Sequence, residues 1–391
     1  MNIVEFEAKA WLRNAGLRTP LGHVLQPGDD SLPAGAVVLK AQVAEGGRGK
    51  RGLVLPLEAG APDAAATLRR LRERMVALGH AAPVVLAEQA VEIRQECYAA
   101  WDIDDVAQDY VFRFSPRGGV DVESLASEVC SLHFAPSQTP VAHQFVDFFV
   151  QAGLEGRTVG AMCRFACAAW RVFVHNDAQL LEINPLAVLP DGDAMALDAK
   201  LDLDDNARPR HADWAGLYSA RLADRESTEL ERRAAADGFT FVELDGEVAI
   251  LAGGAGIGMA ILDILADAGM PAANFADASG GSGVDVFEAL GRITFERAAR
   301  DDVRAILMYF TLAATSVANV VRGLERLLDA APPPKPLVIG LLCCGAAERE
   351  MTFMQARERF AARGLRCEPG LNEALDALAR ARAEGGCHPH P

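Results

Sequence analysis

The chain has 391 residues, half of them hydrophobic, and is therefore long enough for two or three domains with their own cores. Its 38 basic and 54 acidic residues give a formal net charge of −16, which disfavours nonspecific binding to nucleic acids or anionic membranes. No apolar run reaches transmembrane length and the first residues, MNIVEFEAKAW, lack the long apolar core of a secretory signal, so we expect a soluble cytoplasmic protein.

The first part of the chain, to about residue 205, is predicted to be rich in strands. An amphipathic helix opens it and ends at Gly16, and helical periodicity recurs around residues 64–78 and 140–172. The predicted strands are AVVLKAQV, RGLVLPL, PVVLAEQAV, ECYAAWDID and DYVFRFS. The chain then becomes charged at about 206–240, where we place an inter-domain connection. The predicted domains are 1–240, including this connection, and 241–385, followed by a flexible tail at 386–391.

From Glu243 onward, apolar strands alternate regularly with amphipathic helices. The strands EVAILAGG, NFADAS, VRAILMYFT and PLVIGLLCC each precede a helical segment, and a last helix covers NEALDALARARAEG. This alternation predicts a parallel, doubly wound α/β sheet of about 140 residues, whose ligand would lie beyond the carboxyl ends of the strands.

The segment LEINPLAVLPDGDAMALDAK, residues 181–200, predicts a β-hairpin that turns at PDGD. Glu182 and Asn184 point to one face because side chains alternate along a strand, and antiparallel pairing brings Asp198 opposite Asn184. A carboxylate with an amide oxygen suits Mg²⁺, which leaves its other positions to water and phosphate. The alternative is that NP and DG merely mark loops and that the acids are solvated.

A glycine-rich segment, AEGGRGK, lies between the first two predicted strands. Glycines let a backbone approach a polyphosphate, and Arg48 with Lys40 on the preceding strand would supply cations. Because strands flank it on both sides, it is a lid on a hairpin and not a P-loop, or else a flexible basic turn. Glu88 ends one strand and Glu96 begins the next, so both could face a nucleotide between two lobes, although such glutamates are often only solvated.

Several longer motifs together resemble the β subunit of succinyl-CoA synthetase and related ADP-forming acid–CoA ligases. The motifs are MNIVEFEAKAWLRNAGLRTPLG, KAQVAEGGRGKRG, Glu88 with Glu96, GGVDVESLA, LEINPL…GD…LDAKL…NA and LDGEVAILAGGAGIGMAILDILADAGMPAANFAD. The resemblance covers nearly the whole chain. It implies an α/β protein with an N-terminal ATP-grasp fold of two lobes and a flavodoxin-like CoA-ligase domain.

The resemblance also implies roles for individual residues. Glu182 would face the phosphohistidine segment of a partner α subunit, which also binds most of CoA, and Arg48 would stabilise charge on the moving phosphoryl group. Pro20 favours ATP over GTP. Asn184 and Asp198 would hold Mg²⁺. The residues implied to bind the nucleotide are Lys40, Gly47, Arg48, Gly49, Glu88, Glu96 and, through its backbone near the adenine, Val91.

The second domain departs from this family where the acid substrate is expected. Gly253 stands where succinyl-CoA synthetases carry asparagine, and the strand that should enter an FGGI-type turn reads YFTLAATSVAN, residues 309–319. The next strand ends in LLCCGAAER. These changes remove backbone and side-chain donors, and Leu312, Ala313, Ala314 and Thr315 would present methyl groups instead. We therefore expect that the substrate is a carboxylic acid other than succinate. The alternative is that the acid-binding site has decayed and the chain serves a different transfer.

Two further interpretations come from other classes of protein. GGAGIG after EVAIL could form a dinucleotide-binding turn of the GxGxxG type. Gly254 and Gly256 match its first two glycines, but Met259 occupies the position of the third. The other is a noncatalytic or regulatory subunit derived from the ligase that still binds Mg-ATP. The string around His80 resembles a phosphohistidine context, but it lies in a helix-to-strand loop, so we do not expect a catalytic histidine in this chain.

Overall fold

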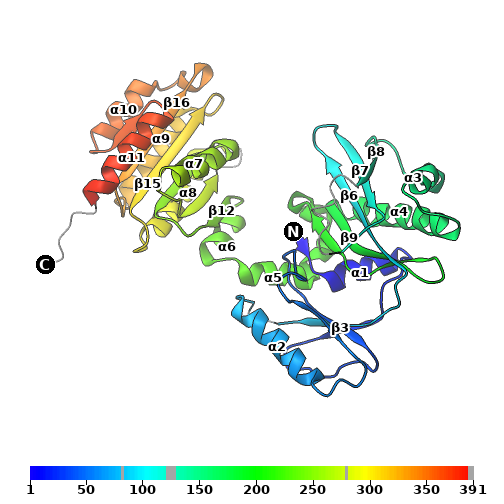
Figure 1. The fold of residues 1–391 in the computed structure, drawn as a ribbon. Helices are drawn as coiled ribbons and strands as arrows, with labels where there is room; N and C mark the ends of the chain where they lie inside the picture. Colours follow the sequence, from blue (N-terminus) through cyan, green and yellow to red (C-terminus); the bar gives the residue numbers. More distant parts are fainter. Residues whose placement is uncertain (81–82, 120–128, 278–280, 386–391) are drawn as a thin grey trace. The chain divides into compact units, whose positions relative to one another are not determined.

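The computed structural model describes residues 1–80, 83–119, 129–277 and 281–385. The chain forms two compact units, Met1–Ala223 and Asp224–Pro391, which are described separately (Figure 1). The division lies inside the charged segment 206–240 and assigns its last part to the second unit. No helix in the described ranges is both long and apolar enough to cross a bilayer. The expected tail at 386–391 and most of the GGVDVESLA motif, from 120 to 126, fall outside the described residues.

The first unit contains a large antiparallel sheet with the strand order β1-β11-β9-β6-β7-β8, to which β10 adds by pairing with β9. Its strands are β1 (Asn2–Ile3), β6 (Gln95–Asp104), β7 (Asp109–Ser115), β8 (Cys130–Phe134), β9 (Ala178–Val188), β10 (Ala194–Ala196) and β11 (Lys200–Leu203). Its helices are α1 (Glu5–Asn14), α3 (Val146–Gln151) and α4 (Arg157–His175), with a 3-10 turn at Ala142–Phe145.

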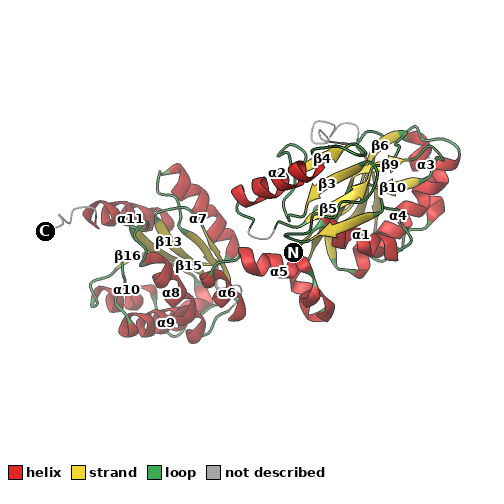
Figure 2. Ribbon diagram, turned by 90° about the horizontal axis from the view of Figure 1, so that it is seen from below, coloured by secondary structure: helices red, strands yellow, loops and turns green. Residues whose placement is uncertain are grey.

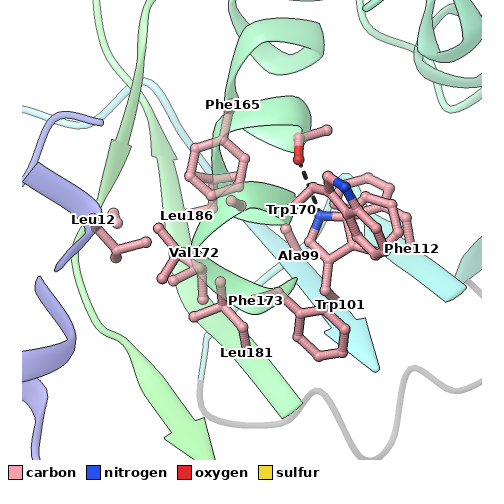
Figure 3. Packing of buried hydrophobic residues seen from close by; sticks show 14 of the residues in the cluster. Leu12, Ala99, Trp101, Phe112, Phe165, Trp170, Val172, Phe173, Leu181 and Leu186 are labelled. Atoms are coloured by element: carbon pink, nitrogen blue, oxygen red, sulfur yellow. Dashed lines mark hydrogen bonds between the residues drawn. The ribbon is translucent and has the colours of Figure 1, made fainter. Parts of the chain in front are cut away.

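An aromatic core joins one face of this sheet to α4 (Figures 2 and 3). Trp101 of β6 is 1% exposed and its ring centroid lies 4.9 Å from that of Trp170. Its indole Nε1 donates to the carbonyl of Ala166 at 3.0 Å, because a buried N–H needs a partner. Side chains that alternate with Trp101 point to the opposite face of the sheet, which is left for a binding site.

A second, four-stranded sheet in the first unit has the order β2-β5-β3-β4 and packs against α2 (Ala64–Ala77). Its strands are β2 (Gly22–Leu25), β3 (Val37–Ala41), β4 (Val54–Leu57) and β5 (Val85–Gln89). The glycine-rich segment joins β3 to β4, which pair antiparallel, so the predicted hairpin is confirmed and its role as a lid stays a prediction. The unit ends in two 3-10 turns, Asp205–Arg210 and Ala212–Gly216, and in α5 (Tyr218–Glu226), which spans the division.

The second unit is a six-stranded sheet in the order β12-β14-β13-β15-β16-β17. Its strands are β12 (Thr240–Glu243), β13 (Val248–Gly253), β14 (Asn274–Asp277), β15 (Ala305–Leu312), β16 (Leu337–Cys343) and β17 (Arg366–Glu368). Its helices are α6 (Glu229–Ala236), α7 (Ala255–Asp267), α8 (Val284–Ala298), α9 (Val317–Ala330), α10 (Phe353–Ala361) and α11 (Leu371–Gly385), with a 3-10 turn at Gly345–Glu348.

The five strands from β13 to β17 are parallel and follow the flavodoxin-like order 2-1-3-4-5, which confirms the predicted doubly wound fold. One core contains residues of α8, α9 and α10, and the core on the other face contains residues of α7 and α11 (Figure 2). One edge strand was not predicted: β12 precedes the alternating segment and pairs antiparallel with β14. The sequence also gave no sign of β17, which is only three residues long.

Candidate active site

A cavity of about 670 Å³ opens in the first unit between the glycine-rich segment and the open face of the large sheet. Lining side chains come from the β3–β4 connection, β6, β7 and the hairpin at 181–200. Tyr98, Arg113 and Lys200 also line it, although the sequence analysis did not select them. Of the predicted site residues, the cavity is lined by Gly47, Arg48, Gly49, Glu96, Glu182, Asn184 and Asp198, and not by Lys40, Glu88 or Val91.

The hairpin register places Asp198 opposite Asn184, as predicted. The pairs Ala196↔Leu186 in β10 and Lys200↔Glu182 in β11 belong to one continuous register, and Asp198 lies in the gap between these strands. The Asn184 amide is fixed by the backbone of Gly119, which donates to Oδ1 at 2.8 Å and accepts from Nδ2 at 3.1 Å. The two proposed metal ligands therefore face each other across neighbouring strand segments.

The remaining acceptor capacity of this pair fits Mg²⁺. Asp198 Oδ1 accepts from Arg48 Nη2 at 2.5 Å and from its neighbour's backbone N–H at 2.7 Å, whereas Oδ2 accepts no hydrogen bond from the described residues. The Asn184 carbonyl oxygen keeps its second lone pair. No group of three or more His, Cys, Asp or Glu side chains gathers elsewhere in the described ranges as a metal site. A site of few protein oxygens suits an ion that retains water and phosphate ligands.

A network of opposite charges borders the cavity, with Glu5, Arg48 and Asp198 among the lining residues. Glu5 Oε1 lies 2.6 Å from Lys9 Nζ and accepts from Lys40 Nζ at 2.8 Å, and its other oxygen lies 2.8 Å from Arg48 Nη2. Glu88 pairs with both lysines, at 2.6 Å and 2.8 Å. The network consists of three cations, Lys9, Lys40 and Arg48, and three carboxylates, Glu5, Glu88 and Asp198.

Two lysines of the network also bind the backbone carbonyl of Leu197, the residue that precedes Asp198. Lys9 Nζ donates to the carbonyl of Leu197 at 2.8 Å, and Lys40 donates to the same oxygen. These contacts tie α1 and the small sheet to the strand segment that carries Asp198. Glu88 and Lys40 are therefore held by protein partners in this structure, and their predicted contacts with a nucleotide stay predictions. Glu5 and Lys9 were missed, although an acid and a base four positions apart on one helix face were a visible signal.

The network shifts the pKa values of its members, and the pKa of Lys9 is lowered because burial, together with the nearby charge of Lys40, outweighs the attraction of its carboxylate partners. Burial alone would raise the pKa of Glu5, but the charges of Lys40, Lys9 and Arg48 and a hydrogen bond from Lys40 hold it well below the usual value. Burial would lower the pKa of Lys40, yet the surrounding carboxylates raise it. Both groups are therefore charged at neutral pH, and so is Arg48.

The glycine-rich segment folds back on itself at the mouth of the cavity. The Arg51 N–H bonds the Gly47 carbonyl at 3.2 Å, and the Leu53 N–H bonds the Arg48 carbonyl at 2.9 Å. Gly47 has a φ of +70°, a left-handed conformation that favours glycine, and a Cβ there would meet no atom within 4 Å. The backbone next to Arg48 is therefore open to the cavity, as the approach of a polyphosphate requires.

The predicted acid site in the second unit lies at the switch point of the sheet, at the carboxyl ends of β13 and β15. Gly253 pairs in register with Phe310, and a Cβ on Gly253 would lie only 2.8 Å from Phe310 Cδ1. Leu312 is 2% exposed and packs in the core, so it does not face this edge. Ala313 and Ala314 are exposed and offer methyl groups only.

Fold and site together define an ATP-grasp protein, and an ATP-grasp domain is matched over residues 2–188. The succinate–CoA ligase [ADP-forming] subunit beta of Rubrobacter xylanophilus is 33% identical over 350 residues, 87% of this chain and 89% of that protein. The succinate–CoA ligase [GDP-forming] subunit beta of Thermus thermophilus is 33% identical over 359 residues, covering 90% and 92%. The chain thus belongs to the family of succinate–CoA ligase β subunits, a family of acid–thiol ligases.

A solved structure shares the overall fold of the chain. The ATP citrate lyase from Methanothrix soehngenii, in complex with citrate and coenzyme A, superimposes with a TM-score of 0.69 at 20% identity. The match covers 96% of this chain and 99% of that one. At this identity the similarity establishes the fold alone.

Proposed function

We propose that the chain is the β subunit of an ADP-forming carboxylate–CoA ligase. It would use Mg-ATP to phosphorylate a histidine of a partner α subunit and so drive the synthesis of an acyl-CoA. The observation that carries this proposal is the cavity in which the glycine-rich segment, Arg48, Glu182 and the pair Asn184–Asp198 meet. Family membership supports the partner, since the relatives are named as subunits. The relatives include both ADP-forming and GDP-forming enzymes. We propose ATP as the nucleotide of this chain because Pro20 favours it over GTP.

In the first step, an imidazole nitrogen of the partner's histidine attacks the γ-phosphorus with its lone pair. The bond to the bridging oxygen breaks and ADP leaves with that electron pair. Arg48 stabilises the negative charge of the moving group, and the open backbone at Gly47 and Gly49 accommodates the phosphates. Asn184 and Asp198 would hold Mg²⁺, which supplies charge neutralisation between the phosphates. Glu182 orients the incoming imidazole.

The later steps transfer the phosphoryl group to a carboxylate and then exchange it for CoA. A carboxylate oxygen attacks phosphorus and frees the histidine, giving an acyl phosphate. The CoA thiol, as thiolate, then attacks the acyl carbon and inorganic phosphate leaves. We propose an acid other than succinate, because Gly253 is packed against Phe310 and the exposed Ala313 and Ala314 provide no polar side chains for a second carboxylate.

The test is co-expression with an α-like partner, followed by a screen of carboxylic acids for ADP release that depends on both ATP and CoA. Asp198→Ala should abolish phosphorylation of the partner's histidine. Asp191→Ala is the matched control, since this exposed carboxylate lies in the turn of the same hairpin. Substantial phosphorylation by Asp198→Ala would refute the metal role. If Mg-ATP binds but no acid supports ADP formation, the chain is instead a regulatory subunit derived from the ligase.

A further inference from the structure

A row of charged residues crosses the open face of the large sheet at the floor of the cavity. The strand registers align Arg113 of β7 with Ala100 of β6, Ala100 with Glu182 of β9, and Glu182 with Lys200 of β11. Arg113, Glu182 and Lys200 all line the cavity. They share the face opposite the aromatic core, because their neighbours Phe112, Leu181 and Leu201 are buried in that core.

Arg113 is anchored by one edge of its guanidinium only. Its Nε donates to Asp102 Oδ2 at 2.6 Å, and Asp102 lies diagonally across from it on β6. The described residues provide no hydrogen-bond acceptor for Nη1 or Nη2, and the side chain is 35% exposed. The hydrogen bond and charge of Asp102 raise the pKa of Arg113, so the group is charged throughout the physiological range. This geometry holds a cation in place with its remaining donors available to a ligand.

The spacing of the row fits a phosphoryl group. Neighbouring strands lie about 4.8 Å apart, so the backbones of Arg113 and Glu182, two strands apart, are separated by about 10 Å across the sheet. The short side chain of Ala100 lies between them. Lys200, on the other side of Glu182, is exposed and lines the same cavity. A tetrahedral anion above Ala100 could therefore reach a cation while Glu182 contacts an imidazole.

The charge balance of the site explains why such a cation is needed. Lys9, Lys40 and Arg48 are matched by Glu5, Glu88 and Asp198, so the buried network has no uncompensated positive charge. In the proposed transfer the phosphoryl group moves toward Glu182, a carboxylate that would repel it. A cation with open donors beside Glu182 offsets this repulsion.

We propose that Arg113, positioned by Asp102 and assisted by Lys200, binds the phosphoryl group as it passes between the nucleotide and the histidine of the partner subunit. This inference rests on the proposed function. It assigns Arg113 to the transferred group and not to nucleotide binding. The two roles are separable, since a nucleotide contact changes the affinity for ADP and a contact with the transferred group changes the rate of transfer.

The experiment uses the complex of both subunits and measures formation of the phosphohistidine in a single turnover at saturating Mg-ATP. Arg113→Met should slow this step about 10- to 100-fold, the effect of losing one charge-assisted contact, while the Kd of Mg-ADP stays within about twofold. Arg113→Ala should recover part of its rate in millimolar guanidinium chloride, which a purely structural role would not produce. Arg171→Met on the exposed side of α4 makes the same charge change outside the cavity and should leave the rate unchanged.

The outcomes separate this inference from the proposed function. If the wild-type complex forms phosphohistidine and Arg113→Met does so equally fast, the inference is overturned and the proposed function stands. A loss of Mg-ADP affinity that accounts for the whole rate effect would also overturn it, because Arg113 would then belong to the nucleotide site. If the wild-type complex forms no phosphohistidine, the proposed function itself fails.

Discussion

Lys9→Met tests whether the buried charge network holds the first unit together. Lys9 is fully buried in α1, and its ammonium group contacts Glu5, both oxygens of Glu88 and the carbonyl of Leu197, all between 2.6 and 2.8 Å. Methionine fills a similar volume without the charge. Two cations would then face three carboxylates, leaving one uncompensated negative charge in the interior.

Removing one partner from a buried ion pair typically costs about 3–5 kcal/mol, because the remaining charge has lost its solvation and its counterion. We therefore expect Lys9→Met to lower the free energy of unfolding of the first unit by about that amount. Adding Glu88→Gln removes the orphaned charge and leaves an amide that can donate to the Leu197 carbonyl. The double variant should therefore lose less than about 2 kcal/mol relative to the wild type.

Tryptophan fluorescence during urea unfolding isolates the first unit, since all four tryptophans, Trp11, Trp101, Trp170 and Trp214, lie within Met1–Ala223. An unchanged m-value shows that the same surface unfolds in each variant. Lys200→Met removes the same charge from an exposed position and should change stability by no more than about 0.5 kcal/mol. A loss below about 1 kcal/mol for Lys9→Met, or a double variant less stable than the single one, would refute the reasoning.

Three further predictions follow from other contacts. The pKa of Glu5 is held below its ordinary value of 4.5, so in acid the unfolded state binds more protons than the folded state. The urea concentration at the unfolding midpoint should therefore decrease as the pH is lowered below about 5, and this decrease should be less steep in Glu5→Gln. Arg48→Gln frees Asp198 Oδ1 from its ion pair and should strengthen nucleotide-free Mn²⁺ binding in electron paramagnetic resonance while weakening Mg-ADP binding; weaker Mn²⁺ binding would contradict this. Gly253→Ala should destabilise the second unit by about 1–3 kcal/mol in thermal circular dichroism, because its Cβ would lie 2.8 Å from Phe310, and Phe310→Leu in the same chain should recover part of the loss.

The hairpin and the alignment of Asn184 with Asp198 were predictable because local rules determine them. Alternation along the strand, the PDGD turn and the apolar pattern fix the register that sets Asp198 opposite Asn184. The alternation of strands and helices after Glu243 likewise predicted the flavodoxin-like unit. Both edge strands escaped prediction, since β12 has four residues, β17 has three, and neither carries a periodic signal.

Most pairings in the charge network were not predictable, because the partners are distant in sequence and only Glu5 and Lys9 lie four positions apart. Lys9 and Glu88 are 79 positions apart, and a charged residue on an amphipathic helix ordinarily indicates a solvated face. Arg113 was missed for a similar reason. A single basic residue in a strand of alternating pattern indicates only which face of the sheet is polar, and not what that residue binds. Its alignment with Glu182 depends on the order of strands in the sheet, which places β6 between β7 and β9.

The three-against-three charge balance also constrains how this part of the chain can change during evolution. Any single substitution that removes a charge from Glu5, Lys9, Lys40 or Glu88 leaves a buried ion without its counterion. Neutral drift at these positions must therefore proceed by compensated double changes, through intermediates that selection would remove. We expect sequence variation among descendants of this chain to show the acids and bases of the network lost in pairs and retained in pairs, even where they are far apart in the sequence.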